Sequence, residues 1–269
     1  MAILPRTFWA ALGFAGLMAA SPADSPPDTT QQNQILQRIG DYAGQYVERL
    51  PNFVCEQVIS QFQAGRRGKH WRKGDTLSSK LMYNEGREER TLELVNNRPV
   101  QSKMRFWRTP LVTEGEFGML LEDIFRASSH ARFQWDHWDS VQGKQLAVFN
   151  FFIDKQHSTL RLSLSDLAKA IVPYHGSIYA DSDSGEIWQV TNTVSEIPGA
   201  LQTKSLTTTI KYGKIDIGGK TYLLPVHATV MVVTNVERDR NEIDFTGYRK
   251  FEAESTITYT PGPDSPPKP

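Results

Sequence analysis

The stretch GGKTYLLPVHATVMVV, residues 218–233, decides the fold class of this chain. It opens with a Gly-Gly turn signal and continues as a strand that is apolar on nearly both faces, yet proline stands at position 225. Proline has no backbone N–H for a ladder, so strands tolerate it at an edge or at a β-bulge, where they bend. We expect Pro225 to mark a bend in a strongly curved sheet, with Gly213 as a second bend; an edge proline in a plain buried strand is the alternative.

Outward from this stretch, period-two alternation continues along most of the chain. The strand at 146–153 is apolar on both faces, which requires a cover on each side, whereas 249–259 alternates cleanly and meets water on one side. Turn residues separate the strands and predict an antiparallel meander. The expected strands are 53–62, 77–85, 89–96, 132–138, 144–154, 158–164, 176–182, 186–195, 203–217, 220–234 and 243–260.

Helical periodicity occurs in three places. An apolar stripe at spacings of four and three predicts an amphipathic helix from about residue 30 to 50, ended by Pro51. Short helices are expected at 116–126 and at 165–172, the latter capped by Ser165. The predicted class is α+β: a strongly curved antiparallel sheet, an incomplete barrel of about 10 or 11 strands, with the N-terminal helix and two short helices covering one side.

The two ends of the chain predict its organisation. Residues 1–23 have the charged start, apolar stretch and small residues of a secretory signal peptide, so we expect a periplasmic or secreted protein. Residues 24–30 and the proline-rich tail 261–269 are expected to be disordered. Residues 31–260 contain no repeat or linker and are expected to form a single half-barrel domain.

Composition narrows the function further. The chain has 30 Lys and Arg against 30 Asp and Glu, which argues against a nucleic-acid partner. Its single cysteine, Cys55, cannot form an internal disulfide and is expected to be a small, inert core residue. The usual catalytic and nucleotide-binding motifs are absent, so we expect no enzyme, no catalytic residues and no cofactor.

Two stretches carry a family resemblance. YADSDSGEIWQV (179–190) and IGGKTYLLPVHATV (217–230) resemble the bacterial outer-membrane lipoprotein-sorting and carrier superfamily. The resemblance implies an incomplete β-barrel wrapped around helices, with a cavity for acyl chains. LPNFVCEQ (50–57) is similar to a stretch that follows the first helix in uncharacterised secreted bacterial proteins, and implies no activity.

The two-sided strands predict a ligand cavity. One face of the opening stretch is expected to look into a helix-lined concavity, together with residues of the strands at 144–154 and 186–195. The residues expected to line it are Phe149, Phe151, Trp188, Val190, Leu224, Val226 and Val230. The leading hypothesis is a periplasmic protein that binds a lipid, an acyl chain or another apolar ligand. The alternative is a structural or protein-interaction module of the envelope, with an envelope protein as partner and a filled core.

Two polar clusters each allow a structural interpretation as well as a functional one. The first cluster is a basic run, which is either a solvated hairpin tip or a peripheral contact with the lipid headgroups of a membrane. Its residues are Arg66, Arg67, Lys69, Trp71, Arg72 and Lys73. In residues 133–139, strand alternation would put His137 and Asp139 beside Trp135 and Asp136 beside Trp138. That cluster has too few ligands for a metal, so no metal site is expected; a sugar-stacking surface and an ordinary core-and-rim strand remain open.

Overall fold

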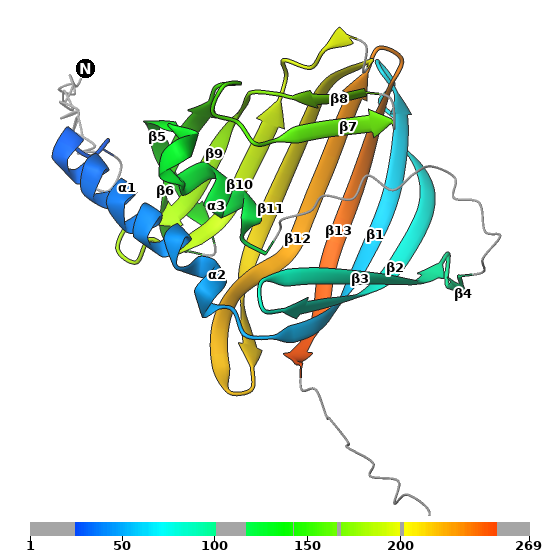
Figure 1. Ribbon diagram of the computed structural model, residues 1–269, viewed down its shortest axis with the longest axis horizontal. Coiled ribbons are helices and arrows are strands. Elements are labelled where there is room, and N and C mark those ends of the chain that lie inside the picture. Colours follow the sequence, from blue (N-terminus) through cyan, green and yellow to red (C-terminus); the bar gives the residue numbers. More distant parts are fainter. Residues whose placement is uncertain (1–24, 101–116, 142, 166–167, 200–201, 252–269) are drawn as a thin grey trace, which may run out of the picture.

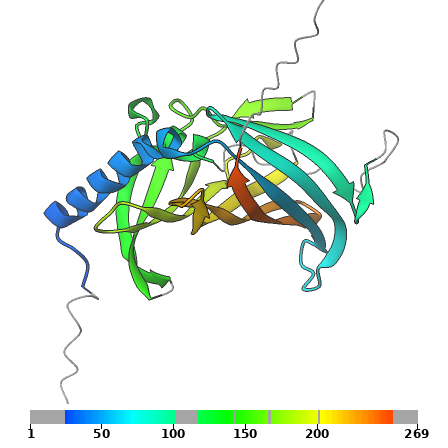
Figure 2. The ribbon, with the colours of Figure 1, turned by 90° about the horizontal axis from the view of Figure 1, so that it is seen from below.

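An open, curved antiparallel sheet dominates the computed structural model, which describes residues 25–100, 117–141, 143–165, 168–199 and 202–251. Eleven strands lie in the order β4-β3-β2-β1-β13-β12-β11-β10-β9-β6-β5. Figure 2 shows the sheet curving into a trough. The edge strands β4 and β5 are not paired with each other, so the described strands form no closed barrel. The expected α+β class and curved antiparallel sheet are confirmed.

The strands follow the predicted series, with shifts at their ends. The strand expected at 243–260 begins earlier, at Glu237, and ends at Lys250; residues 252–260 lie outside the described residues. The bounds are β1 Phe53–Gly65, β2 Arg72–Asn84, β3 Arg87–Val95, β4 Arg98–Pro99, β5 Arg132–Val141, β6 Lys144–Ile153, β9 Tyr174–Asp181, β10 Ile187–Val194, β11 Thr203–Ile217, β12 Lys220–Thr234 and β13 Glu237–Lys250.

The N-terminal helix forms as expected. Helix α1 spans Thr29–Gly44 and begins with a capping box, in which Asp28 accepts from the Gln31 backbone and the Gln31 side chain accepts from the Asp28 backbone. A single turn, α2 (Tyr46–Arg49), follows it. The apolar stripe enters the core, and the Tyr46 hydroxyl donates a 2.9 Å hydrogen bond to the Leu223 carbonyl oxygen. This contact ties the helix to the strand that carries the bend.

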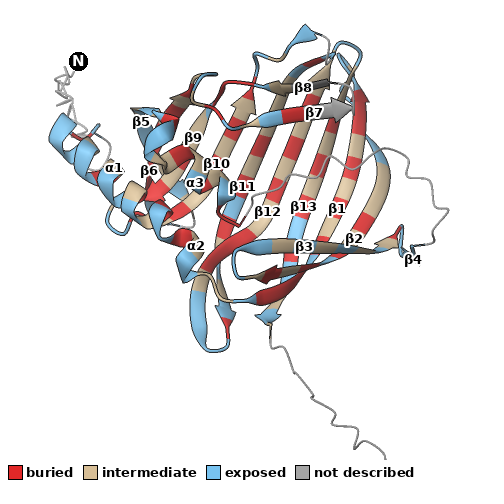
Figure 3. Ribbon diagram, in the orientation of Figure 1, coloured by how far each residue is buried: buried red, intermediate tan, exposed pale blue. Residues whose placement is uncertain are grey.

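Helix α3 confirms the first of the two short helices. It spans Met119–Phe125, buries Leu121 and Ile124, and is followed by the 3-10 turn η1, Ala127–Ser129. Figures 1 and 2 show α1 and α3 on the concave side of the sheet, where they and the inner strand faces share one hydrophobic core. Figure 3 shows buried positions recurring along the central strands. No helix in the described ranges combines the length and apolarity that a membrane crossing requires.

The second short helix, expected at 165–172, is wrong. Strands β7 (Arg161–Ser165) and β8 (Ala168–Ile171) pair there as a separate antiparallel hairpin. Leu160, Leu162 and Leu164 alternate with polar residues, and this period-two pattern extends into β7. An eight-residue helix is marginal by itself, so the pattern outweighs a serine cap and a following proline.

Pro225 does mark a bend. Lys211 pairs with His227 and Tyr212 pairs with Pro225, so Val226 is the extra residue of a β-bulge. The ladder between β12 and β13 begins only at His227, so no residue of β13 pairs with position 225 and requires a backbone N–H there. The Tyr248 hydroxyl donates a 2.5 Å hydrogen bond to the Pro225 carbonyl oxygen and fixes the bent segment.

Candidate functional site

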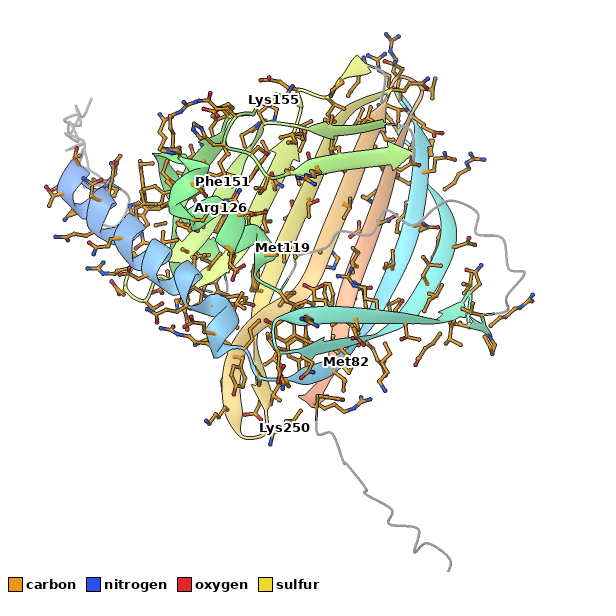
Figure 4. The ribbon with its side chains drawn as sticks, in the orientation of Figure 1. Met82, Met119, Arg126, Phe151, Lys155 and Lys250 are labelled. Carbon is orange, nitrogen blue, oxygen red and sulfur yellow. The ribbon has the colours of Figure 1, made fainter. Side chains whose placement is uncertain are left out.

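A cavity of about 810 Å³ lies on the concave side, between strands β1 to β3 and the start of α3. Its volume is within the range of small-molecule sites, roughly 300–1,000 Å³. Met119, at the start of α3 (Figure 4), is 55% exposed at its rim. The lining residues are Val47, Gln57, Ile59, Leu77, Ser79, Tyr83, Gly86, Arg87, Glu88, Glu89, Arg90, Leu92, Phe117, Met119 and Glu122.

Strand pairing explains the back wall of this cavity. Residues directly opposite each other in antiparallel strands share a face. One face of β1 and β2 therefore carries the pairs Phe53–Tyr83, Cys55–Leu81, Gln57–Ser79 and Ile59–Leu77. Most of this row is apolar, and the Gln57–Ser79 pair places amide and hydroxyl groups in its middle.

Two buried polar atoms in this wall have no hydrogen-bond partner among the described residues. They are Nε2 of Gln57 and the hydroxyl oxygen of Tyr83, whose residues are 1% and 2% exposed. A buried polar group left unsatisfied costs about 1–3 kcal/mol, and native structures contain few of them. Both residues line the cavity. A ligand in the cavity could therefore form hydrogen bonds with the amide of Gln57 and the hydroxyl of Tyr83.

Tyr83 is held in place by aromatic neighbours. Its ring stacks on Phe53 at a centroid distance of 5.1 Å and an interplanar angle of 11°, and the Phe117 ring lies 6.0 Å away. Burial, with the carboxylates of Glu88 and Glu122 adding to it, raises the pKa of Tyr83. The phenol therefore stays protonated and can donate a hydrogen bond.

Charged residues from β3 complete the wall. Nη2 of Arg90 lies 2.8 Å from Oε2 of Glu88, and both side chains are 16% exposed. A partly buried pair is screened less by salt than a surface pair. Glu88 lies opposite Tyr83 in the β2–β3 pair, so the two charges make the end of the cavity near Tyr83 more polar.

A second bulge decides which leucine of β3 enters the cavity. Ser79 pairs with Leu92, but the neighbouring Ser78 pairs with Leu94, so Glu93 is the extra residue. Adjacent residues of β2 point to opposite faces, and their partners therefore do so too. Leu92 lines the cavity with Ser79, whereas Leu94 lies on the other face of the sheet.

The residues predicted to line a cavity lie elsewhere in the molecule. None of the seven lines the 810 Å³ cavity. Phe149 lines a smaller pocket of about 360 Å³ with Leu36, Phe133 and Trp135. Phe151 (Figure 4), Val190, Leu224 and Val230 are buried in the hydrophobic core, with Trp188 packed against it.

The bulge at Val226 interrupts the common face expected for Leu224, Val226 and Val230. Leu224 pairs with Gly213 and Val230 pairs with Thr208. Those partners are an odd number of residues apart on an unbulged strand, so they point to opposite faces. The bulge at Val226 accounts for the change of face within β12.

A third bulge rearranges the cluster at 133–139. Trp135 pairs with Phe149 and His137 with Val148, which leaves Asp136 as the extra residue. Trp135 and Trp138 consequently lie on the same side, with ring centroids 4.8 Å apart, and the predicted division of faces is wrong. The described part of the chain holds no group of three or more His, Cys, Asp or Glu arranged for a metal.

Cys55 and the basic run are the remaining sequence candidates. Cys55 is 1% exposed and burial raises the pKa of its thiol to about 12, which opposes formation of a nucleophilic thiolate. The basic run forms the turn between β1 and β2 and the first residues of β2, at the end of the strands away from Phe53.

Sequence reasoning missed the cavity's polar pair. Gln57 interrupts the apolar row formed by Phe53, Cys55 and Ile59, and this interruption is visible in the sequence. Its meaning depends on Ser79 lying opposite, which only the register of β1 and β2 shows.

Comparisons with known proteins return structures but no sequence family. No family model matches the chain, and no curated protein matches it. A LolA superfamily protein from Nitrosomonas europaea is 11% identical, with a TM-score of 0.40, over 81% of this chain and 94% of that one. A Vibrio parahaemolyticus domain described as an outer membrane lipoprotein-sorting protein is 10% identical, with a TM-score of 0.40, over 84% and 95%.

A third solved structure, a DUF1329 family protein from Desulfovibrio piger, is 11% identical, with a TM-score of 0.36, over 83% of this chain and 94% of that one. The descriptions of the first two structures name the superfamily that the stretches at 179–190 and 217–230 resemble.

Proposed function

We propose that this protein binds an amphiphile, a molecule with an apolar tail and a polar head, in the cavity between β1, β2, β3 and α3. The observation that carries the proposal is the presence of two unsatisfied polar atoms, on Gln57 and Tyr83, in the wall of a cavity that also has an apolar part.

The apolar part of the wall suits a hydrocarbon tail. Side chains from β1, β2, β3, α2 and the start of α3 form it: Val47, Ile59, Leu77, Leu92, Phe117 and Met119. Each buried methylene contributes about 0.8 kcal/mol. A tail that buries about ten methylenes would gain about 8 kcal/mol before the costs of binding.

The polar atoms suit a head group that accepts hydrogen bonds. Gln57 Nε2 can only donate, and the protonated Tyr83 hydroxyl can donate as well. Head-group oxygens that accept a hydrogen bond from each of these groups would remove the cost of leaving them unsatisfied. A pure hydrocarbon would leave that cost in place, so the ligand with a polar head should bind more tightly.

The proposal includes binding without catalysis, in the periplasm or outside the cell. The secretory pattern of residues 1–23 supports the compartment, although those residues lie outside the described ranges. The raised pKa of Cys55 supports the absence of thiol chemistry. An envelope protein that delivers or receives the ligand is the partner that such a carrier would require.

Filling the cavity tests the proposal. Leu92→Trp places an indole in the cavity, and Leu94→Trp places the same indole on the opposite face of the same strand. Uptake of the fluorescent dye N-phenyl-1-naphthylamine reports an accessible apolar cavity. We expect Leu92→Trp to lose dye uptake, with Leu94→Trp and the wild type taking up the dye equally.

Thermal unfolding of the same three proteins is the second measurement. In an open cavity the indole of Leu92→Trp has room, so the midpoint should stay close to that of Leu94→Trp. A wild type without dye uptake, combined with a large fall in the midpoint of Leu92→Trp alone, would mean that the space is a filled core. That result would leave the structural or interaction module as the better account.

A further inference from the structure

We propose that one end of the sheet is a docking surface for an anionic lipid membrane. We define this basic end as the turn and strand start at 66–73 together with the facing turn and strand start at 235–240. Strand pairing brings the two segments together, because Gly65 lies opposite Glu237, and the Arg66 backbone donates a 2.9 Å hydrogen bond to the Val236 carbonyl oxygen.

Positive charge is concentrated and exposed at the basic end. Residues 66–73 contain Arg and Lys at five positions and no acid, and all five are exposed: Arg66, Arg67, Lys69, Arg72 and Lys73. The acids of the facing turn are directed inward. Glu237 accepts a 2.6 Å hydrogen bond from Gln63, and Asp239 is buried. The surface presented to solvent is therefore cationic.

Trp71 organises the two turns into one surface. The guanidinium groups of Arg238 and Arg240 lie 5.1 and 4.6 Å from the centre of its ring. Arg238 also donates to the carbonyl oxygen of Gly68, across the gap between the turns. Nε of Arg240 also lies 3.0 Å from Oε1 of Glu242, which balances part of the positive charge gathered at this indole.

The tip carries an apolar residue beside the charges. Val236 is 72% exposed at the end of the β12–β13 turn. Lysine and arginine near an anionic bilayer are attracted to its surface, and an apolar tip residue with a tryptophan behind it suits the headgroup boundary. The indole of Trp71 is already stacked by guanidinium groups, so it is not free to stack on a nucleic-acid base. The combination favours a membrane surface.

Vesicle binding tests the proposal with two charge-matched variants. Arg67→Gln/Lys69→Gln/Lys73→Gln removes three exposed cations from the basic end. Lys211→Gln/Lys214→Gln/Lys220→Gln removes three exposed lysines along β11 and its far turn, so the net charge falls equally. Sedimentation with phosphatidylcholine vesicles, with and without phosphatidylglycerol, measures partitioning. Thermal midpoints of both variants confirm folding.

We expect the wild type to sediment with the vesicles that contain phosphatidylglycerol and to be released by salt. Each cation near an anionic surface contributes about fivefold, so the first variant should partition about 100-fold less. The second should match the wild type. The proposal is overturned if the wild type ignores phosphatidylglycerol, if both variants lose binding equally, or if a DNA oligonucleotide binds as tightly as the vesicles.

Discussion

Gly213 and Val226 face each other across β11 and β12 at a separation that leaves no room for another carbon. A Cβ atom on Gly213 would lie 2.8 Å from Cγ1 of Val226. Val226 is the bulged residue beside Pro225, so the absence of a side chain at position 213 accommodates the bend in the sheet.

Gly213→Ala should therefore destabilise the protein by about 1–3 kcal/mol, the range for overpacking. Val226→Ala in the same chain removes the atom that the new methyl group meets, so the double variant should recover part of the loss. Urea unfolding of the two single variants and the double variant measures the coupling. Strictly additive losses would show that the two residues do not share this contact.

Removing either unsatisfied polar group of the cavity should lower the affinity for a ligand without lowering the stability of the protein. Tyr83→Phe deletes a hydroxyl that has no partner among the described residues, so the free energy of unfolding should stay the same or rise slightly. Affinity for a fluorescent fatty acid should fall about tenfold, the equivalent of about 1.4 kcal/mol for a lost hydrogen bond.

Gln57→Leu is the matched test of the second donor, with a side chain of similar size. Its stability should also hold or rise, and its fatty-acid affinity should fall by a similar factor. A large loss of stability in either variant, with unchanged affinity, would assign the two groups to the fold and not to a ligand.

Cys55 should be inert in the native protein. Burial raises the pKa of the thiol to about 12, so almost no thiolate forms near neutral pH. A maleimide reagent should label the unfolded chain quickly and the native protein slowly. Cys55→Ala should retain ligand binding, and Cys55→Ser should be the less stable of the two because it buries a hydroxyl. Rapid native labelling would contradict this account.

Asp181 gives a defined pH dependence. Burial works against its ionisation, but hydrogen bonds from Lys144 and Ser184 outweigh it and hold the pKa of the carboxyl at about 2, below the usual 3.8. A depressed folded-state pKa adds stability that is complete well above pH 3.8 and is lost as the pH falls through 2. The stability advantage of the wild type over Asp181→Asn should shrink over that interval. An advantage independent of pH would show that ionisation of Asp181 is not its source.

The sequence predicts the bend in this sheet but not its consequence. An apolar strand tolerates proline only at an edge or at a bulge, and Pro225 lies beside the bulge at Val226. A bulge also exchanges the faces of the residues beyond it, as it does for Val230 and for Trp138. Bulges are set by which strand pairs with which, a long-range property that alternation within one strand does not contain.

The same limit applies to the candidate site. Gln57 within an apolar row is a local signal that the sequence itself contains. Its pairing with Ser79 and the position of Phe117, in the turn before α3, depend on register and tertiary packing. The helix predicted at 165–172 is wrong for another reason: a serine cap and a following proline are weaker signals than the alternation that extends into β7.

The central claim is that the cavity lined by Gln57, Tyr83 and Leu92 holds an amphiphile. Organic extraction of the natively purified protein, followed by mass spectrometry, tests it most directly, with Leu92→Trp and Leu94→Trp purified in parallel. We predict an amphiphile in stoichiometric amount from the wild type and from Leu94→Trp, and its loss from Leu92→Trp. Equal amounts of the same lipids from all three proteins, or none from any of them, would contradict the claim.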